Sequence, residues 1–173
     1  MLEIELEKTY LAKYLPEDLK TSKSKEIKDI YIPKDIKHPV MRIRQKGDKY
    51  EITKKQPLKE NDSSEQSEHT INLTKEEFLA LEQVPGRGVH KIRYYYNHRG
   101  VQAEVDVFQD DLKGLVLVDF EFKEVADKDN FEMPDFCLAD VTQDELFAGG
   151  MLCGKKYTDI ENHLKELGYK RID

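Results

Sequence analysis

Alternation of charged and apolar residues is the feature that most limits how this chain can fold. In residues 1–11, three glutamates (Glu3, Glu5 and Glu7) alternate with apolar residues. Successive side chains of a β-strand point to opposite faces, so a strand here would place three carboxylates on one face. Like charges on one face repel, and we therefore expect a cation to lie among them.

The same alternation continues along most of the chain. The further predicted strands are residues 28–33, 40–46, 49–55, 68–73, 89–97, 101–108 and 115–123. In residues 101–108, for example, Gln102, Glu104 and Asp106 alternate with small apolar residues. An open antiparallel sheet would leave such charged faces in water, whereas a closed sheet would enclose them. The charged faces carry both signs in similar number, and we therefore predict an α+β fold: an eight-stranded antiparallel β-barrel with a charged lumen and helices packed outside.

The segments between the strands contain turn and helix signals. Residues 56–67 are rich in Ser, Asn, Asp, Glu and Lys, which predicts a mobile loop. Thr74, Thr142 and Thr158 are each followed three residues later by Glu, the capping pattern that predicts a helix start. Gly168 is expected to end the last helix.

Length and composition exclude several classes of protein. A chain of 173 residues suits one domain, residues 1–173. The net charge of −7 argues against a nucleic-acid surface, and no apolar run approaches the roughly 20 residues that span a bilayer. The N-terminus carries acids where a signal peptide carries bases, and the two cysteines form no disulfide framework. We therefore expect a cytoplasmic protein with reduced thiols.

Short charged motifs follow one another in a defined order. They are Glu5-x-Glu7, Arg42-x-Arg44, Thr53-x-Lys55, Glu68, Lys91-x-Arg93, Glu104-x-Asp106, Asp119-x-Glu121 and Asp140-Val141-Thr142. Each motif alone is weak, but the ordered series resembles the CYTH superfamily, the triphosphate tunnel metalloenzymes, over roughly the whole chain. The resemblance implies a barrel that binds a triphosphate through basic residues, with Mg²⁺ or Mn²⁺ held by carboxylates.

The candidate site residues follow from this resemblance and from their chemistry. The phosphate-binding candidates are Arg42, Arg44, Lys55, Lys91, Arg93 and Lys155. The metal-binding candidates are Glu5, Glu7, Glu68, Glu104, Asp106, Asp119 and Glu121. Arginine binds phosphate oxygens bidentately, and hard divalent cations prefer carboxylate oxygens.

Roles can be assigned within this set. We expect Glu5, Glu7 and Glu121 to hold the principal metal, and a second metal near Glu104 or Asp106 to activate the attacking water. Glu5, Glu7, Arg93 and Asp106 are the catalytic candidates.

One position departs from the family pattern. The family opening is E-x-E-x-K, and its lysine corresponds to Thr9 when the motif starts at Glu5, or to Glu7 when it starts at Glu3. Neither register supplies the lysine. Lys155 or Lys156, in the late segment, is the candidate replacement.

The expected function is that of a metal-dependent phosphohydrolase acting on inorganic triphosphate. The sequence shows no spare aromatic module, such as a tryptophan-rich segment, to stack a base or a thiamine ring. Adenylate cyclase and thiamine triphosphatase are the alternatives within the superfamily, and a non-catalytic polyphosphate- or nucleotide-binding module is the alternative outside it. The expected partner is a small triphosphate, with no nucleic acid or membrane; monomer and homodimer both stay open.

Overall fold

The computed structural model describes residues 3–36, 41–59, 62–148 and 150–173, without the side chains of residues 3–5, 59 and 62–64. The strands are β1 (Glu3–Ala12), β2 (Lys23–Ile32), β3 (Met41–Lys46), β4 (Lys49–Lys59), β5 (Asp62–Leu73), β6 (Arg87–His98), β7 (Val101–Phe108), β8 (Val116–Phe122) and β9 (Cys137–Asp140). The α-helices are α1 (Lys75–Leu81), α2 (Val125–Asp129) and α3 (Tyr157–Glu166), and short 3₁₀ turns lie at Leu19–Thr21, Asp110–Leu112 and Glu145–Phe147.

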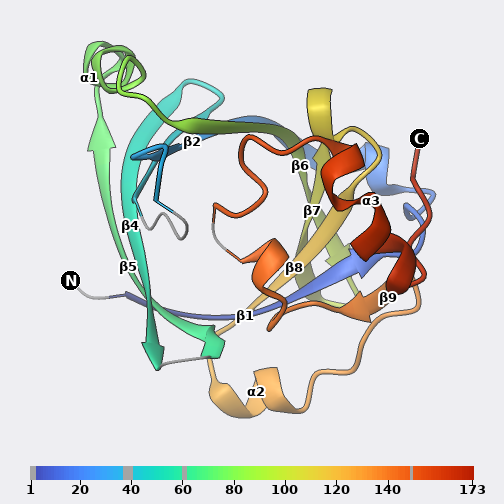
Figure 1. The fold of residues 1–173 in the computed structure, drawn as a ribbon. Helices are drawn as coiled ribbons and strands as arrows, with labels where there is room; N and C mark the ends of the chain where they lie inside the picture. Colours follow the sequence, from blue (N-terminus) through green and yellow to red (C-terminus); the bar gives the residue numbers. More distant parts are fainter. Residues whose placement is uncertain (1–2, 37–40, 60–61, 149) are drawn as a thin grey trace.

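The sheet closes on itself. Its strands follow the order β5-β4-β3-β2-β6-β7-β8-β1, and β1 then pairs with β5 to complete the ring (Figure 1). Neighbouring strands are antiparallel throughout, and β9 adds to β1 at Tyr10–Ala12. The predicted eight-stranded antiparallel barrel is therefore confirmed, with β9 as an extra strand that the sequence did not reveal.

Apolar side chains face outward from most of the barrel wall. On the outside of β1, β7 and β8, Tyr10, Val105 and Phe120 belong to a buried cluster that also includes Phe136. On the far wall, α1 inserts Phe78 against the outer face of β3 and β4. Because alternate residues point the other way, this outer packing turns the charged residues of the same strands into the lumen.

The C-terminal part of the chain fills one end of the barrel. Leu11, Phe108 and Leu117 project inward there and belong to one core cluster with Phe147 and Leu152, which lie between β9 and α3. Figure 1 shows this connecting segment crossing the barrel in front of the strands. The lumen is therefore apolar at this end and charged along the rest of its length.

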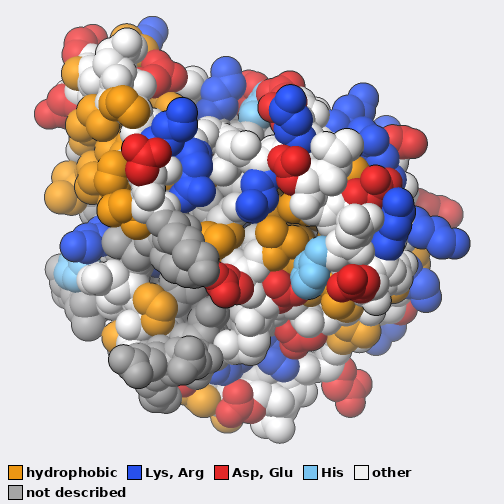
Figure 2. Space-filling model, in the orientation of Figure 1, with side chains coloured by type: hydrophobic (Ala, Val, Ile, Leu, Met, Phe, Trp, Pro, Cys, Tyr) orange, Lys and Arg blue, Asp and Glu red, His pale blue; other side chains and the backbone are white. Residues whose placement is uncertain are grey.

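Part of the outer face stays apolar and exposed. Figure 2 shows hydrophobic side chains gathered beside α1. Ile71 on β5 and Leu79 on α1 are among the exposed large hydrophobic residues. The described helices include none with the length and hydropathy of a membrane span.

The predicted mobile loop at residues 56–67 is wrong where the structure describes it. Gln56 pairs with Ser67 and Pro57 with Gln66, so the segment forms the ends of β4 and β5. Residues 60–61 lie outside the described residues. The far edge of β5 pairs with β1, so the ladder bonds on both edges outweigh the weak strand propensity of these polar residues.

The three predicted helix starts have different outcomes. Thr74 caps α1 as expected, since the Glu77 amide donates to Thr74 Oγ1 (3.2 Å) and the Thr74 amide donates to Glu77 Oε2 (2.7 Å). The start at Thr158 is wrong by two positions, because α3 begins at Tyr157 and Asp159 accepts the amide of Lys156 (2.7 Å).

The helix predicted to start at Thr142 is also wrong. Thr142 Oγ1 accepts the Thr9 amide (3.0 Å) and donates to Asp140 Oδ1 (2.6 Å), so this side chain covers the edge of β1 rather than capping a helix. A single 3₁₀ turn follows instead, with the Leu146 amide donating to Asp144 Oδ1.

Candidate functional site

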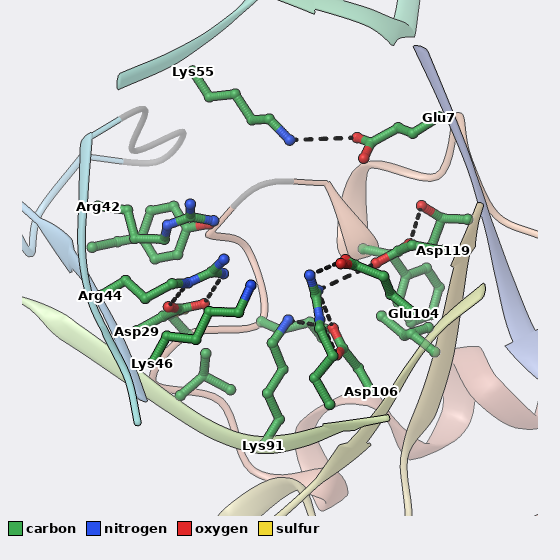
Figure 3. A pocket seen from close by; sticks show the side chains of 18 of the residues that line it. Glu7, Asp29, Arg42, Arg44, Lys46, Lys55, Lys91, Glu104, Asp106 and Asp119 are labelled. Carbon is green, nitrogen blue, oxygen red and sulfur yellow. Dashed lines mark hydrogen bonds and ion pairs between the residues drawn. The ribbon is translucent and has the colours of Figure 1, made fainter. Parts of the chain in front are cut away.

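A cavity of about 280 Å³ occupies the charged part of the lumen. The charged residues that line it are Glu7, Asp29, Arg42, Arg44, Lys46, Glu51, Lys55, Glu68, Lys91, Arg93, Glu104, Asp106, Asp119 and Glu121 (Figure 3). They come from all eight strands of the barrel, because each strand turns one face inward. The cavity is thus built from the alternation that runs through the whole sequence.

Most residues predicted from the sequence meet in this cavity. Those that line it are Glu7, Arg42, Arg44, Lys55, Glu68, Lys91, Arg93, Glu104, Asp106, Asp119 and Glu121. The side chain of Glu5 lies outside the described residues, and the structure places only its backbone, opposite Gln66 of β5.

Lys155 is not brought into the barrel. It lines a separate cavity of about 300 Å³ together with Lys28 and His90, while the lining of the charged cavity does not include it. Its neighbour Lys156 is exposed and precedes the first turn of α3. Neither lysine lines the charged cavity.

Several charged or polar lining residues were not among the site candidates from the sequence, and these include Asp29, Tyr31, Lys46, Glu51 and Gln66. A signal for them was present. Asp29 and Tyr31 alternate with isoleucines along β2, and Lys46 is two residues beyond Arg44 on the same face of β3.

Arg44 is held in the wall by a buried carboxylate. Its Nε donates to Asp29 Oδ1 (2.6 Å) and its Nη2 to Asp29 Oδ2 (2.7 Å), and both residues are buried. Burial opposes ionisation of Asp29, but the Arg44 guanidinium outweighs it and holds the pKa of this carboxyl well below its usual range. The pair fixes the direction in which Arg44 faces the lumen.

A second buried carboxylate organises the cations of β6. Asp106, only 1% exposed, accepts Arg93 Nε and Nη2 at 2.7 Å each and also the ammonium of Lys91. Burial again opposes ionisation, and Arg93 and Lys91 outweigh it, so the pKa of Asp106 is depressed. Both oxygens of Asp106 are therefore engaged with cations.

Crowded carboxylates lie next to Arg93, on β7 and β8. Glu104 contacts Arg93 Nη1, and Asp119 lies 3.7 Å from Arg93 Nη2 and accepts the hydroxyl of Thr9 (2.7 Å). Burial, and then the charges of Asp106 and Glu7, raise the pKa of Asp119 to about 7. Asp119 is therefore short of compensating positive charge.

Glu121 lies where this wall opens to solvent. Burial in part, and then the charges of Glu104 and Glu7, raise the pKa of the Glu121 carboxyl, although its side chain is exposed. The accessible end of the cavity is therefore the end that carries Glu121, opposite the apolar end closed by Phe147 and Leu152.

Lys55 connects β4 with the acidic residues of β1 and β5. Its ammonium lies 3.8 Å from Glu7 Oε1 and 3.8 Å from Glu68 Oε2. Gln66 Nε2 donates to the same Glu7 oxygen (3.3 Å). Figure 3 shows Lys55 and Glu7 pointing toward one another across the lumen.

Arg42 makes longer polar contacts with the described residues than Arg44 and Arg93 do. Its Nη2 donates to Thr53 Oγ1 at 3.4 Å and lies 4.0 Å from Glu51 Oε1. Its buried Nε has no hydrogen-bond partner among the described residues. A buried donor left unsatisfied is costly, so an anionic group bound in the cavity would stabilise Arg42.

The donor set fits a hard divalent cation. Glu7, Glu104, Asp119 and Glu121 supply oxygen ligands on one wall, and the raised pKa values of the last two show that added positive charge would relieve them. In the described ranges, no three acidic, histidine or cysteine side chains already converge in a metal-binding arrangement. The present partners of Glu7, Glu104 and Asp119 include Arg93, Lys55, Gln66 and Thr9.

Comparison with known proteins matches residues 1–135 to the CYTH domain. No curated protein sequence matches the chain significantly. Among solved structures, the chain is similar to one described as the inorganic triphosphatase NE1496, with a TM-score of 0.64 and 25% sequence identity, over 87% of this chain and 95% of that one.

Two further solved structures have the same fold. A structure of the hypothetical protein NE1496 gives a TM-score of 0.64 and 26% identity, over 88% of this chain and 99% of that one. The PH1012 protein from Pyrococcus horikoshii OT3 gives a TM-score of 0.52 and 16% identity, over 96% of this chain and 91% of that one. The family match ends before β9 and α3, so the segment that fills the apolar end lies beyond it.

Proposed function

The chain belongs to the CYTH domain family, and from this premise we propose that it is a metal-dependent phosphohydrolase that cleaves inorganic triphosphate. The observation that carries the proposal is the division of one cavity into a cationic wall and an acidic wall. The cavity has a volume of about 280 Å³. Its lining includes the cations Arg42, Arg44 and Lys91 and the carboxylates Glu7 and Asp119. A polyanion bound through a divalent cation needs both walls at once.

The cationic wall is the proposed phosphate site. Arg42, Arg44, Lys55, Lys91 and Arg93 project into the cavity from β3, β4 and β6. Arginine forks bind phosphate oxygens in pairs, and Asp29 and Asp106 hold two of these forks in place before any ligand arrives. A preorganised cationic wall avoids the cost of ordering these long side chains when the substrate binds.

The acidic wall is the proposed metal site. Glu7, Glu104, Asp119 and Glu121 would hold Mg²⁺ or Mn²⁺, with Glu68 at the adjoining strand and Glu5 as the sequence-based candidate on β1. When bound, such an ion neutralises phosphate charge and lowers the pKa of a coordinated water. To hold such an ion, the carboxylates would give up their present contacts with Arg93 and Lys55.

The protein's own part in the reaction is binding and charge stabilisation. Water attacks the terminal phosphorus in line, the bridging P–O bond breaks, and phosphate and pyrophosphate leave. Arg42 and Arg93 stabilise the charge that spreads over the transferring oxygens. Asp106, with both oxygens on Arg93 and Lys91, acts by positioning these cations rather than as a ligand of the metal.

Inorganic triphosphate is preferred over an organic triphosphate because the cavity lining offers few aromatic rings for stacking. Of its aromatic residues, Phe108 and Phe147 are packed in the core cluster at the apolar end, which leaves Tyr31 as the aromatic lining residue outside that cluster. Similarity to a structure described as an inorganic triphosphatase points to the same substrate.

A substrate panel tests the proposal. Tripolyphosphate, pyrophosphate, ATP and thiamine triphosphate are each incubated with Mg²⁺, with Mn²⁺ and with a chelator, and phosphate and cyclic AMP are measured. We expect phosphate release to be fastest from tripolyphosphate and to stop with chelator. Cyclic AMP from ATP would instead identify a cyclase. Tight binding of tripolyphosphate with no product would identify a binding module, and either result would overturn the proposal.

A further inference from the structure

We propose that Lys46 is an additional substrate-binding residue, whose ammonium holds a phosphate group of a linear polyphosphate. The inference rests on the proposed function, since it concerns the same cavity. Three observations support it: the position of Lys46 on β3, the ion pairs that the other cations of the cavity make, and the uncharged side chain of Thr9 on β1.

Lys46 lies on the same face of β3 as two arginines. Arg42, Arg44 and Lys46 occupy alternate positions on β3 and all three line the cavity, while Ile43 between them is buried on the other face. Alternate residues of a strand are about 7 Å apart, so the three cations form a ladder about 13 Å long from first to last. Figure 3 shows the Lys46 side chain reaching toward the middle of the cavity, between Arg44 and Lys91. A linear chain of phosphate groups matches this row of cations.

The Lys46 ammonium has no acidic partner among the described residues. Arg44 is paired with Asp29, both Lys91 and Arg93 contact Asp106, and Lys55 has carboxylates at 3.8 Å. For Lys46, by contrast, the described residues provide no carboxylate within ion-pair distance. Its ammonium nitrogen lies over the ring of Tyr95, 5.4 Å from the ring centre. A partly buried ammonium without a counter-ion favours a bound anion.

The β1 strand lacks a cation that Lys46 can replace. At Thr9, where the family's opening motif has lysine, the hydroxyl donates to Asp119 and offers no charge to a phosphate. Lys155, expected to compensate, lies in a different cavity. Lys46 provides the missing positive charge from the opposite wall. Its flexible stem and point charge suit a phosphate group whose orientation is set by the arginines.

The experiment compares three variants with the wild-type protein. Lys46→Met removes the charge and keeps a stem that can lie on Tyr95, and Lys46→Arg keeps the charge. Lys54→Met is the matched control, because Lys54 is an exposed lysine on the neighbouring strand and does not line the cavity. Tripolyphosphate binding is measured by calorimetry in chelator, and KM and kcat are measured with Mn²⁺.

We expect Lys46→Met to weaken tripolyphosphate binding and raise KM about tenfold, with a smaller change in kcat. Lys46→Arg should stay within about threefold of wild type, and Lys54→Met should not differ from it. Unchanged binding and KM in Lys46→Met would overturn the role of Lys46 and leave the proposed function intact. Wild-type protein that binds tripolyphosphate without hydrolysing it would overturn the proposed function, while the binding data would still decide the role of Lys46. Wild-type protein that neither binds tripolyphosphate in chelator nor hydrolyses it with Mn²⁺ would overturn both.

Discussion

Asp29 and Arg44 form a bidentate ion pair inside the barrel wall, with Nε and Nη2 of the arginine 2.6 and 2.7 Å from the two carboxylate oxygens. Asp29 is 3% exposed and Arg44 is 7% exposed, so neither charge has free access to water. The pair joins β2 to β3 and aims an arginine at the cavity. If Arg44 binds phosphate as proposed, stability and substrate binding are coupled at this point of the fold.

Breaking this pair should destabilise the protein. Asp29→Asn leaves the Arg44 charge buried without its partner, and we expect the free energy of unfolding to fall by about 3 kcal/mol. Urea denaturation at pH 7 measures the change. Asp48→Asn is the control, since Asp48 is exposed in the turn between β3 and β4. Equal midpoints for Asp29→Asn and wild type would show that the pair contributes nothing to stability.

The buried aspartates should also make stability depend on acid. The folded-state pKa values of Asp29 and Asp106 are depressed, so the stability they contribute is present above the unfolded-state pKa of about 4 and is lost as the pH falls below it. Urea denaturation between pH 7 and pH 3 should show this decline. In Asp106→Asn the decline should be shallower, and parallel curves for the two proteins would contradict the assignment.

Metal affinity is expected to rise with pH. Asp119 has a pKa raised to about 7, and the pKa of Glu121 is raised as well, so part of the acidic wall binds protons at neutral pH and must release them before it holds a cation. Titration with Mn²⁺ should show tighter binding from pH 6 to pH 8. Asp119→Asn should bind more weakly with a flatter pH dependence. A wild-type affinity independent of pH in this range would argue against the carboxylate site.

Without metal, ionisation of Asp119 should lower the free energy of unfolding, whereas ionisation of Asp29 raises it. A folded-state pKa of about 7, above the unfolded value of about 4, means that ionisation of Asp119 lowers the free energy of unfolding as the pH rises between these values. In chelator, Asp119→Asn should remove this loss, so its stability relative to wild type should improve from pH 5 to pH 8. A constant difference between the two proteins would show that Asp119 does not titrate in this range.

Two single substitutions test the walls of the cavity. Arg42→Ala removes a cation from one wall and Glu121→Ala a carboxylate from the other, and each should lower the turnover of tripolyphosphate more than about hundredfold. The far-ultraviolet circular dichroism of both variants should match wild type. Lys54→Ala and Glu132→Ala, both exposed outside the cavity, are the charge-matched controls. Wild-type turnover in both cavity variants would refute the site.

Much of the fold could be predicted from the period of the sequence. The alternation in residues 101–108 matches β7 at both ends, and the ordered motifs place eleven of the predicted charged residues in one cavity. A side-chain period of two determines which residues share a face, and a barrel has only an inner and an outer face. Once the sheet closes, the side chains on the inner face of every strand share one lumen.

Other features depended on contacts between distant segments. The polar ends of β4 and β5 became strands because β1 supplies a pairing edge, and Thr142 became a partner of β1 instead of a helix cap.

Charge partners were likewise decided by the tertiary structure. Asp106 is a metal-binding and catalytic candidate in the sequence, and in the structure it lies opposite Arg93, with both of its oxygens in contact with cations. Sequence alternation alone determined which residues would face the lumen, because it follows from the local geometry of the strand. Which lumen charges neutralise one another was decided only by the tertiary structure, through the register of neighbouring strands for Arg93 and Asp106 and through closure of the barrel for Lys55 and Glu7, because electrostatic pairing depends on distances between strands.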